Sequence, residues 1–275
     1  AREAVAPLAH HFNMTMEEMA RGIVAIANHH MAQAVRKVSI GRGYDPRHFS
    51  LVAFGGAGPL HATALARLLG IPRVIVPPVP SVFSALGALL SDVRHDYVLT
   101  AVSPVEAVRF EPFAELEAQA LKQLAAEELP AERALFLRSA DLRYAGQNYE
   151  LNVPVAAGDD PASLRKTFEE RHQALYAYTA GETVEVVNLR LTALVPTHPV
   201  LPRSTLATAP ALPLERRRIF LEEGWTEIPV FLRAALMPEQ LVAGPALIEE
   251  EGTTTFVGPR ERAALDPAGL LIAEV

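Results

Sequence analysis

Hydrophobic positions in the first hundred residues alternate between helical spacing and short uninterrupted runs. Apolar residues recur every three or four positions from Met16 to about Ser39, directly after a capping box formed by Thr15 and Glu18. An uninterrupted run of about four apolar residues has the length of a fully buried strand. The strands and helices expected next are, in order, 51–54, 59–69, 73–76 and 82–90. Their alternation predicts an α/β layer with a mainly parallel sheet.

The rest of the sequence shows two further patterns. A helical stripe, two strands joined by a polar loop, a second helix after Asp160 and a final strand predict a small α+β domain. Five prolines between residues 196 and 213 predict a stiff extended linker. Short apolar runs separated by Gly and Pro from Arg216 onward predict a compact antiparallel β unit. The expected domains are therefore 1–103, 104–196 and 197–275.

Composition narrows the classes of function. The formal net charge of −7 disfavours nucleic-acid binding, which usually requires a basic face. The absence of cysteine excludes disulfides and thiolate chemistry and is typical of a cytoplasmic enzyme. No apolar run approaches the roughly 20 residues that cross a bilayer, and no signal peptide is recognisable, so we expect no membrane association. The sequence begins at Ala1 without a methionine, which is typical of a processed or excised fragment.

A glycine-rich turn joins the first expected strand to the helix that follows it. Gly55, Gly56 and Gly58 occur within four residues, and Pro59 suits the first helical position because its missing N–H would have no partner there. Gly70 is placed to end this helix in the left-handed conformation. A strand, a glycine turn and a helix N-terminus together present free N–H groups to an anion or a nucleotide.

Two common nucleotide motifs do not fit this turn. A dinucleotide fingerprint requires a glycine or alanine where His61 stands, and an acidic residue about 20 positions later. No Asp or Glu occurs between Phe54 and Asp92. A phosphate-binding P-loop requires a lysine, and the turn contains none. A tight strand-to-helix turn without any ligand therefore stays open as an alternative.

Paired histidines at 10–11 and 29–30 raise the question of a metal site. Adjacent positions on a helix point about 100° apart, so neither pair has chelating geometry, and no H-E-x-x-H spacing occurs. Core packing or solvated helix ends explain these histidines better, and we expect no metal there.

Five segments spread over nearly the whole chain carry motifs in one order. They are 49–78 around the glycine turn, 83–96, 141–147 (DLRYAGQ), 187–191 (VNLRL) and 244–250 (GPALIEE). Together they resemble the hydantoinase A / 5-oxoprolinase / acetone carboxylase family. The resemblance implies an α/β fold: part of the two-lobed ATPase of actin and sugar kinases, then a small α+β domain and a C-terminal β-rich unit.

The resemblance also implies a chemistry. Gly55, Gly56, Ala57 and Gly58 would lie beside the adenosine of ATP, with Mg²⁺ on the phosphates. The enzyme would activate and hydrolyse a cyclic amide such as a hydantoin, 5-oxoproline or a related lactam, together with a second subunit of the hydantoinase B type. No catalytic base can be named from the sequence.

One family element is missing from this sequence. No G-x-D-x-G-G-T phosphate loop occurs, so we expect a separate N-terminal lobe to complete the ATP site and the lone chain to be inactive. Two alternatives remain: a subunit of an ATP-dependent ketone carboxylase acting on acetone or acetophenone, or a non-catalytic assembly module.

Overall fold

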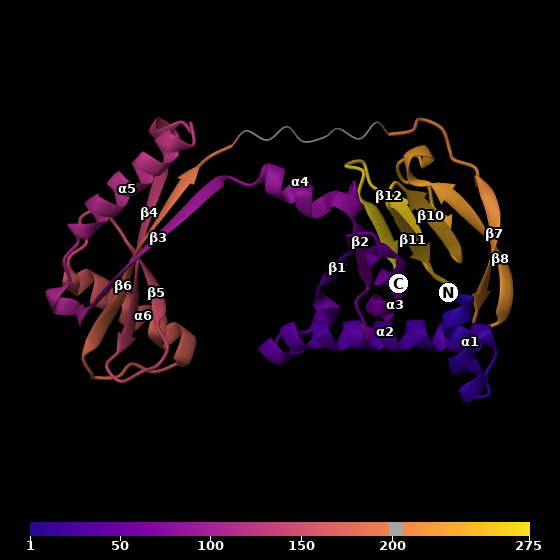
Figure 1. Ribbon diagram of the computed structural model, residues 1–275, viewed down its shortest axis with the longest axis horizontal. Helices are drawn as coiled ribbons and strands as arrows, with labels where there is room; N and C mark the ends of the chain where they lie inside the picture. The colour runs from indigo at the N-terminus through magenta and orange to yellow at the C-terminus, as the bar shows by residue number, and fades with distance from the viewer. Residues whose placement is uncertain (198–205) are drawn as a thin grey trace. The chain divides into compact units, whose positions relative to one another are not determined.

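The computed structural model describes residues 1–197 and 206–275, which divide into two compact units. The first unit joins the two ends of the chain, Ala1–Leu89 and Leu201–Val275, and the second is Leu90–Val200. The colours of Figure 1 show this division, because indigo and yellow elements lie together in one unit. The second unit is therefore inserted into the sequence of the first.

The N-terminal helices of the first unit form as the hydrophobic pattern predicts. The capping box is present: the hydroxyl of Thr15 accepts from the Glu18 N–H at 3.2 Å, and the Glu18 carboxylate accepts from the Thr15 N–H at 2.8 Å. Gly70 ends the third helix with φ at 70°, in the left-handed region that favours glycine. The helices are α1 (Arg2–His11), α2 (Met16–Val38), α3 (Gly58–Leu69) and α4 (Phe83–Leu90).

A five-stranded sheet forms the centre of the first unit, in the order β1-β2-β13-β12-β9. β1 and β2 pair in parallel as expected, but β13 pairs antiparallel with β2 and places Ile272 opposite Ile75. The first strand, expected to be fully buried, instead lies at the sheet edge with Val52 half exposed, because β2 is its one partner among the described strands. The strands are β1 (Ser50–Val52), β2 (Arg73–Val76), β9 (Val242–Ala243), β12 (Arg262–Leu265) and β13 (Leu271–Glu274).

A second sheet in this unit has the order β11-β10-β8-β7. β10 and β8 pair in parallel, whereas an all-antiparallel unit was expected. The expectation of a separate C-terminal unit is also wrong, because β9, β12 and β13 complete the sheet of β1 and β2. The strands are β7 (Glu215–Leu221), β8 (Gly224–Leu232), β10 (Ala246–Glu250) and β11 (Thr253–Val257).

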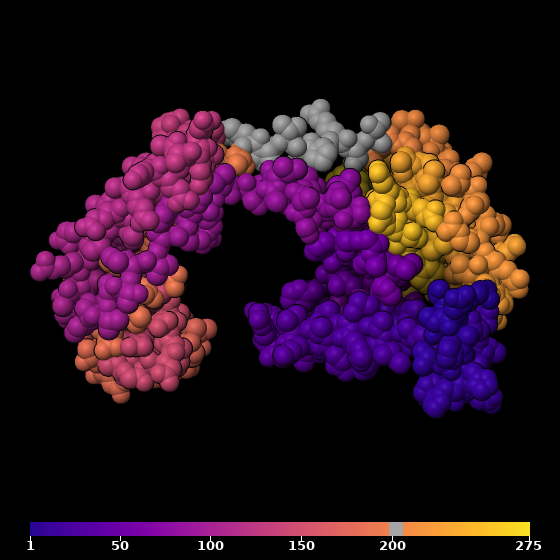
Figure 2. Space-filling model, in the orientation of Figure 1, coloured from indigo at the N-terminus to yellow at the C-terminus, as the bar shows by residue number. Residues whose placement is uncertain are grey.

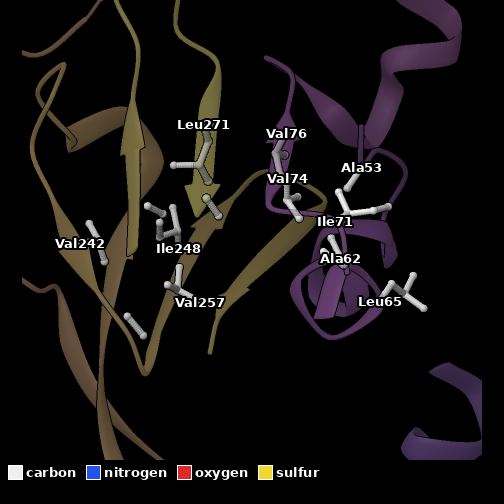
Figure 3. Close-up of a cluster of buried hydrophobic side chains, with 14 of the residues drawn as sticks. Ala53, Ala62, Leu65, Ile71, Val74, Val76, Val242, Ile248, Val257 and Leu271 are labelled. Carbon is white, nitrogen blue, oxygen red and sulfur yellow. The ribbon is translucent and has the colours of Figure 1, made fainter. Parts of the chain in front are cut away.

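One hydrophobic core holds both sheets and α3 together. Val74 and Leu271 lie on neighbouring strands of the first sheet, while Ile248 comes from the second sheet and Leu65 from α3. Figure 3 shows these side chains gathered in the same core, although they are up to about 200 residues apart in sequence. In the space-filling view, yellow C-terminal atoms lie directly against purple atoms from the first hundred residues (Figure 2). This burial of apolar surface fuses the two ends of the chain into one unit.

The second unit is an antiparallel four-stranded sheet with the order β3-β6-β4-β5. β3 extends across the expected domain boundary at residue 103 because it pairs with β6 along most of its length. Two helices pack on one face, where Phe113 and Phe168 contact the buried core. The elements are β3 (Val93–Pro104), α5 (Pro112–Ala126), β4 (Leu135–Tyr144), β5 (Leu151–Val155), α6 (Pro161–Tyr176) and β6 (Val184–Val195).

The proline-rich linker expected at 196–213 lies partly outside the described residues, which resume at residue 206. Asp160, the expected cap of α6, accepts a hydrogen bond from the Ser163 N–H at 2.8 Å. No helix in the described part of the chain is both long and apolar enough to cross a membrane.

Candidate functional site

The glycine turn has the conformation that its sequence predicts. Gly55 has φ at 83°, a left-handed conformation that glycine adopts without strain, and its N–H donates to the Pro80 carbonyl at 2.7 Å. Ala57 precedes α3 as the N-cap residue, and no side chain caps this helix. Among residues 1–197 and 206–275, therefore, no side chain accepts from the N–H groups of the first turn of α3, as an anion-binding helix start requires.

The β10–β11 hairpin from the C-terminal region packs directly on this turn. The Thr253 hydroxyl donates to the Gly56 carbonyl at 2.7 Å, and the Ser81 hydroxyl donates to the Glu251 carbonyl at 3.0 Å. Gly252 approaches Ser81 so closely that an added Cβ would lie 2.8 Å from the serine Cβ. The hairpin is thus bonded directly to the glycine turn and to the Ser81 segment beside it.

A depression of about 410 Å³ lies between the turn and the hairpin. Gly56 and Ala57, two of the four residues predicted from sequence, line it, while Gly55 and Gly58 flank them in the chain without lining it. The other lining residues are Leu60, Glu249, Glu250, Gly252, Thr253 and Thr254. Residues 249–255 (EEEGTTT) are a polar run in the sequence, but nothing in the sequence indicates that they lie beside Gly56, about 195 residues away.

A buried arginine bonds the hairpin to the neighbouring sheet. Arg233 is 7% exposed and forms an ion pair of 2.7 Å with Glu250. Its second terminal nitrogen donates to the carbonyls of Val76 and Gly269 at 2.9 and 2.8 Å. Burial raises the pKa of Glu250, and the Arg233 guanidinium acts in the opposite direction. Arg233 therefore links the end of β10 to the first sheet.

A second depression, of about 380 Å³, is lined by residues at the start of β1 and β2 and at the end of β13. Arg47, Arg73 and Glu274 line it, but it has neither a glycine turn nor a helix start. We therefore take the depression at Gly56 as the candidate site. Within residues 1–197 and 206–275, no group of three or more His, Cys, Asp or Glu is placed to hold a metal ion.

Two family models cover this chain. Residues 1–97 match the hydantoinase/oxoprolinase model, and residues 104–273 match the model of the hydantoinase/oxoprolinase C-terminal domain. The chain belongs to the hydantoinase/oxoprolinase family. The resemblance inferred from the five sequence motifs is thereby confirmed.

Known members of the hydantoinase/oxoprolinase family show what this chain is similar to. The alpha subunit of caprolactamase from Pseudomonas jessenii is 33% identical over 95% of this chain, and the gamma subunit of acetophenone carboxylase from Aromatoleum aromaticum is 32% identical over 94%. A nucleotide-free structure of acetone carboxylase superposes with a TM-score of 0.80 over 97% of this chain at 23% identity. The expected mixed α/β fold is confirmed. The chain spans about 40% of the length of these relatives.

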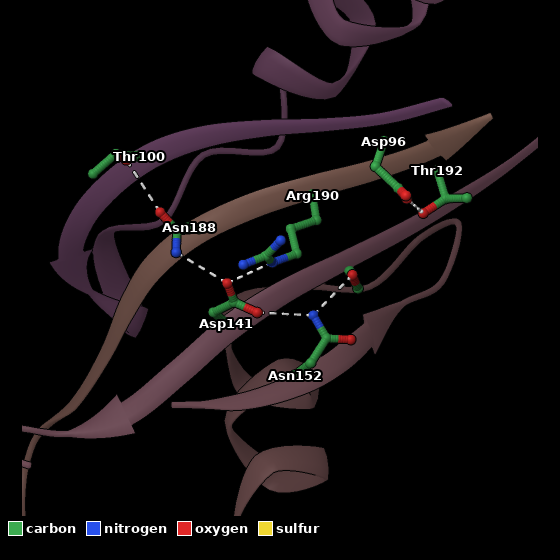
Figure 4. A network of polar contacts seen from close by, with 8 residues as sticks. Asp96, Thr100, Asp141, Asn152, Asn188, Arg190 and Thr192 are labelled. Carbon is green, nitrogen blue, oxygen red and sulfur yellow. Dashed lines mark hydrogen bonds and ion pairs between the residues drawn. The ribbon is translucent and has the colours of Figure 1, made fainter. Parts of the chain in front are cut away.

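The second unit of this hydantoinase/oxoprolinase-family chain brings two of the sequence motifs together. Asp141, from the first motif, is 5% exposed and accepts from Asn188 at 2.9 Å and from Arg190 at 2.6 Å, both in the second motif. Asn152 donates to the other carboxylate oxygen at 2.9 Å, and Thr100 donates to Asn188 at 3.1 Å. Figure 4 shows that these residues form a polar row across all four strands. The row explains why both motifs carry polar residues within strands.

The network controls the charge of Asp141. Burial alone would raise the pKa of this carboxyl, but hydrogen bonds from Asn152 and Asn188 and the ion pair with Arg190 outweigh burial and lower the pKa below its ordinary value of 3.8. The folded state therefore favours the carboxylate more than the unfolded state does. Its stabilising contribution is present above pH 3.8 and is lost as the pH falls through the lower pKa of the folded state.

Replacing Asp141 with asparagine is expected to reduce the free energy of unfolding by about 2–3 kcal/mol at neutral pH. The reason is that an amide N–H₂ would face the donors of the polar row. Asp96→Asn is the matched control on the same sheet. Asp96 is exposed, pairs with Arg94 and accepts from the Thr192 hydroxyl, and exposed contacts of this kind contribute about 0–1 kcal/mol. Hydrogen exchange of β4 and β6 amides measures the change. A difference between wild type and Asp141→Asn that does not shrink under acid conditions would contradict the assignment.

Proposed function

We propose that the depression beside Gly56 holds the adenosine part of ATP, in an enzyme that activates and hydrolyses a cyclic amide. The observation that carries this proposal is the glycine turn at the uncapped start of α3, closed by Thr253 from the C-terminal hairpin. A solved relative, the ATP-dependent caprolactamase from Pseudomonas jessenii, supports both the nucleotide and the lactam. Hydantoins and 5-oxoproline are the substrates that the family name suggests.

The residues of the depression fit a nucleotide. Gly56 and Ala57 let a ligand approach the backbone, and the positive end of the α3 dipole favours a phosphate group. ATP would supply phosphoryl transfer, which converts an unreactive amide oxygen into a leaving group. Mg²⁺ would be held through the phosphates, as is usual for this ion. The chain's own contribution is to bind and orient adenosine, and we assign no proton transfer to these glycines.

Two partners belong to this proposal. An N-terminal lobe would supply the phosphate-binding loop that the sequence lacks, and a second subunit of the hydantoinase B type would assemble with it. The support is that the relatives are named as subunits and that this chain spans only about 40% of their length. A cytoplasmic location would agree with the use of ATP and with the absence of cysteine.

A second candidate function is ATP-dependent ketone carboxylation. The observation that favours it is the 32% identity to the acetophenone carboxylase gamma subunit. This value is almost equal to the 33% identity to caprolactamase, so sequence identity does not separate the two reactions. The two reactions are distinguished by measuring which compound stimulates ATP hydrolysis in the protein supplied with its N-terminal lobe and second subunit. Stimulation by lactams or hydantoins supports amide hydrolysis, whereas stimulation by ketones with bicarbonate supports carboxylation.

Gly56→Val is expected to weaken nucleotide binding at least about tenfold, because its side chain would occupy the depression. A Cβ at this position would lie 3.3 Å from the Gly252 carbonyl, so the fold should need only a small adjustment. Gly22→Val is the control, since a Cβ at Gly22 in α2 meets nothing within 4 Å. Isothermal titration with a non-hydrolysable ATP analogue measures both variants. Unchanged affinity in Gly56→Val would contradict the proposed site, and no binding by the wild type would favour an assembly module.

A further inference from the structure

The candidate depression has two walls of opposite hydrogen-bonding character. On one side are the backbone of Gly56 and Ala57 and the first turn of α3, which offers N–H donors without a side-chain cap. The hairpin side includes two acidic residues, Glu249 and Glu250, and an ionised carboxylate can only accept hydrogen bonds. A ligand that fits must therefore be anionic at one end and must donate hydrogen bonds at the other.

The side chains of Glu249 and Glu250 lie on opposite faces of the hairpin. Glu250 is the cross-strand partner of Thr253, so the two side chains share the face of the hairpin that meets the glycine turn. Glu249 pairs with Thr254 on the opposite face, where it bonds Arg217 at 2.6 Å. Glu250 is also the less exposed, with 14% of its side chain accessible against 27% for Glu249. Hydrogen bonds are stronger where water is largely excluded.

Arg233 leaves one oxygen of Glu250 available. The guanidinium bonds Oε1 at 2.7 Å, while Oε2 has no hydrogen bond to any residue in 1–197 or 206–275. Arg233 is itself fixed by the carbonyls of Val76 and Gly269. Glu250 is therefore anchored through Oε1, and Oε2 remains as an acceptor that the described residues do not use.

We propose that Glu250 accepts a hydrogen bond from a sugar hydroxyl of the bound nucleotide, so that the site selects ribonucleotides over deoxyribonucleotides. The inference rests on the proposed function. An acidic side chain that accepts from ribose hydroxyls is an established way to read a ribose in other nucleotide-binding folds. In this arrangement the phosphate would lie at the N–H donors of the α3 start, and the sugar hydroxyls would lie at the acceptor Glu250. Thr253 acts here as a positioning residue, because it joins the turn to the hairpin.

Glu250→Gln is the most direct test. A glutamine keeps one carbonyl oxygen for Arg233 but places an N–H₂ donor where the free oxygen stood. Glu251→Gln is the matched control, because Glu251 belongs to the same hairpin but does not line the depression. Isothermal titration of each protein with ATP and with 2′-deoxyATP or 3′-deoxyATP gives the preference for the ribonucleotide. Thermal unfolding followed by circular dichroism shows that each variant is folded.

The wild type is expected to bind ATP about tenfold or more tightly than at least one deoxy analogue, as a hydrogen bond to a charged group predicts. Glu250→Gln should reduce this preference to less than about threefold, and Glu251→Gln should keep it. Equal binding of ATP and both deoxy analogues by the wild type would overturn this inference alone, as would an unchanged preference in Glu250→Gln. Failure of the wild type to bind any adenine nucleotide would overturn both the inference and the proposed function.

Discussion

Arg233→Met is expected to lower the free energy of unfolding of the first unit by about 3–5 kcal/mol. Methionine fills similar volume but leaves Glu250 without its cation and two carbonyls, of Val76 and Gly269, without a donor. The loss is large because Arg233 is only 7% exposed, so water cannot replace these bonds easily. Urea denaturation measures this change in the free energy of unfolding. It is followed by the fluorescence of Trp225, the only tryptophan, which lies in β8 of the same unit.

The matched control for this variant is Arg217→Met. Arg217 also pairs with a hairpin carboxylate, Glu249, but its side chain is 43% exposed. Exposed ion pairs contribute about 0–1 kcal/mol, so the control should unfold near the wild-type denaturant concentration. Equal destabilisation by the two variants would show that Arg233 does not hold the hairpin on the first sheet.

The purified 275-residue chain is expected to show no ATP hydrolysis above background. Phosphoryl transfer depends on positioned cations around the phosphates, and none of the three lysines (Lys37, Lys122, Lys166) lies in the glycine turn. Electrostatic stabilisation of the transition state supplies several kcal/mol, and each 1.36 kcal/mol corresponds to about a tenfold change in rate. The missing phosphate contacts should therefore cost many decades of rate. A coupled phosphate-release assay with Mg²⁺ and candidate lactams measures the rate of ATP hydrolysis.

Addition of the proposed N-terminal lobe is the control for this experiment, because it should restore turnover if the site is shared between two parts. The Gly56→Val variant should remain inactive after the same addition. Robust hydrolysis by the chain alone would mean that its active site lies elsewhere than beside Gly56.

Local sequence signals predicted the local elements well. The capping box of Thr15 and Glu18, the helix with Pro59 in its first turn and Gly70 at its end, and the Asp160 cap each depend on residues within a few positions of one another. The chemistry of such caps is complete within one helical turn. The sequence therefore contains all that is needed to recognise them.

Features that depend on distant pairing could not be predicted in the same way. The apolar run of β13 indicates a strand but not its partner, and its position beside β2 follows from packing of a core formed by both ends of the chain. For the same reason, Thr253 and Glu250 were visible as polar residues but not as neighbours of Gly56. The edge position of β1 likewise depends on which strands pair, and its apolar run cannot reveal that.

The insertion of the second unit has a consequence for biosynthesis. Translation completes β3 and β6, which pair with one another, before any residue of β7 to β13 leaves the ribosome. The second unit can thus acquire its whole sheet early, while β2 waits with an unpaired edge for the final residues of the chain. An unpaired edge is a template for aggregation, so the interval between residue 76 and residue 271 is the vulnerable period in the synthesis of this protein.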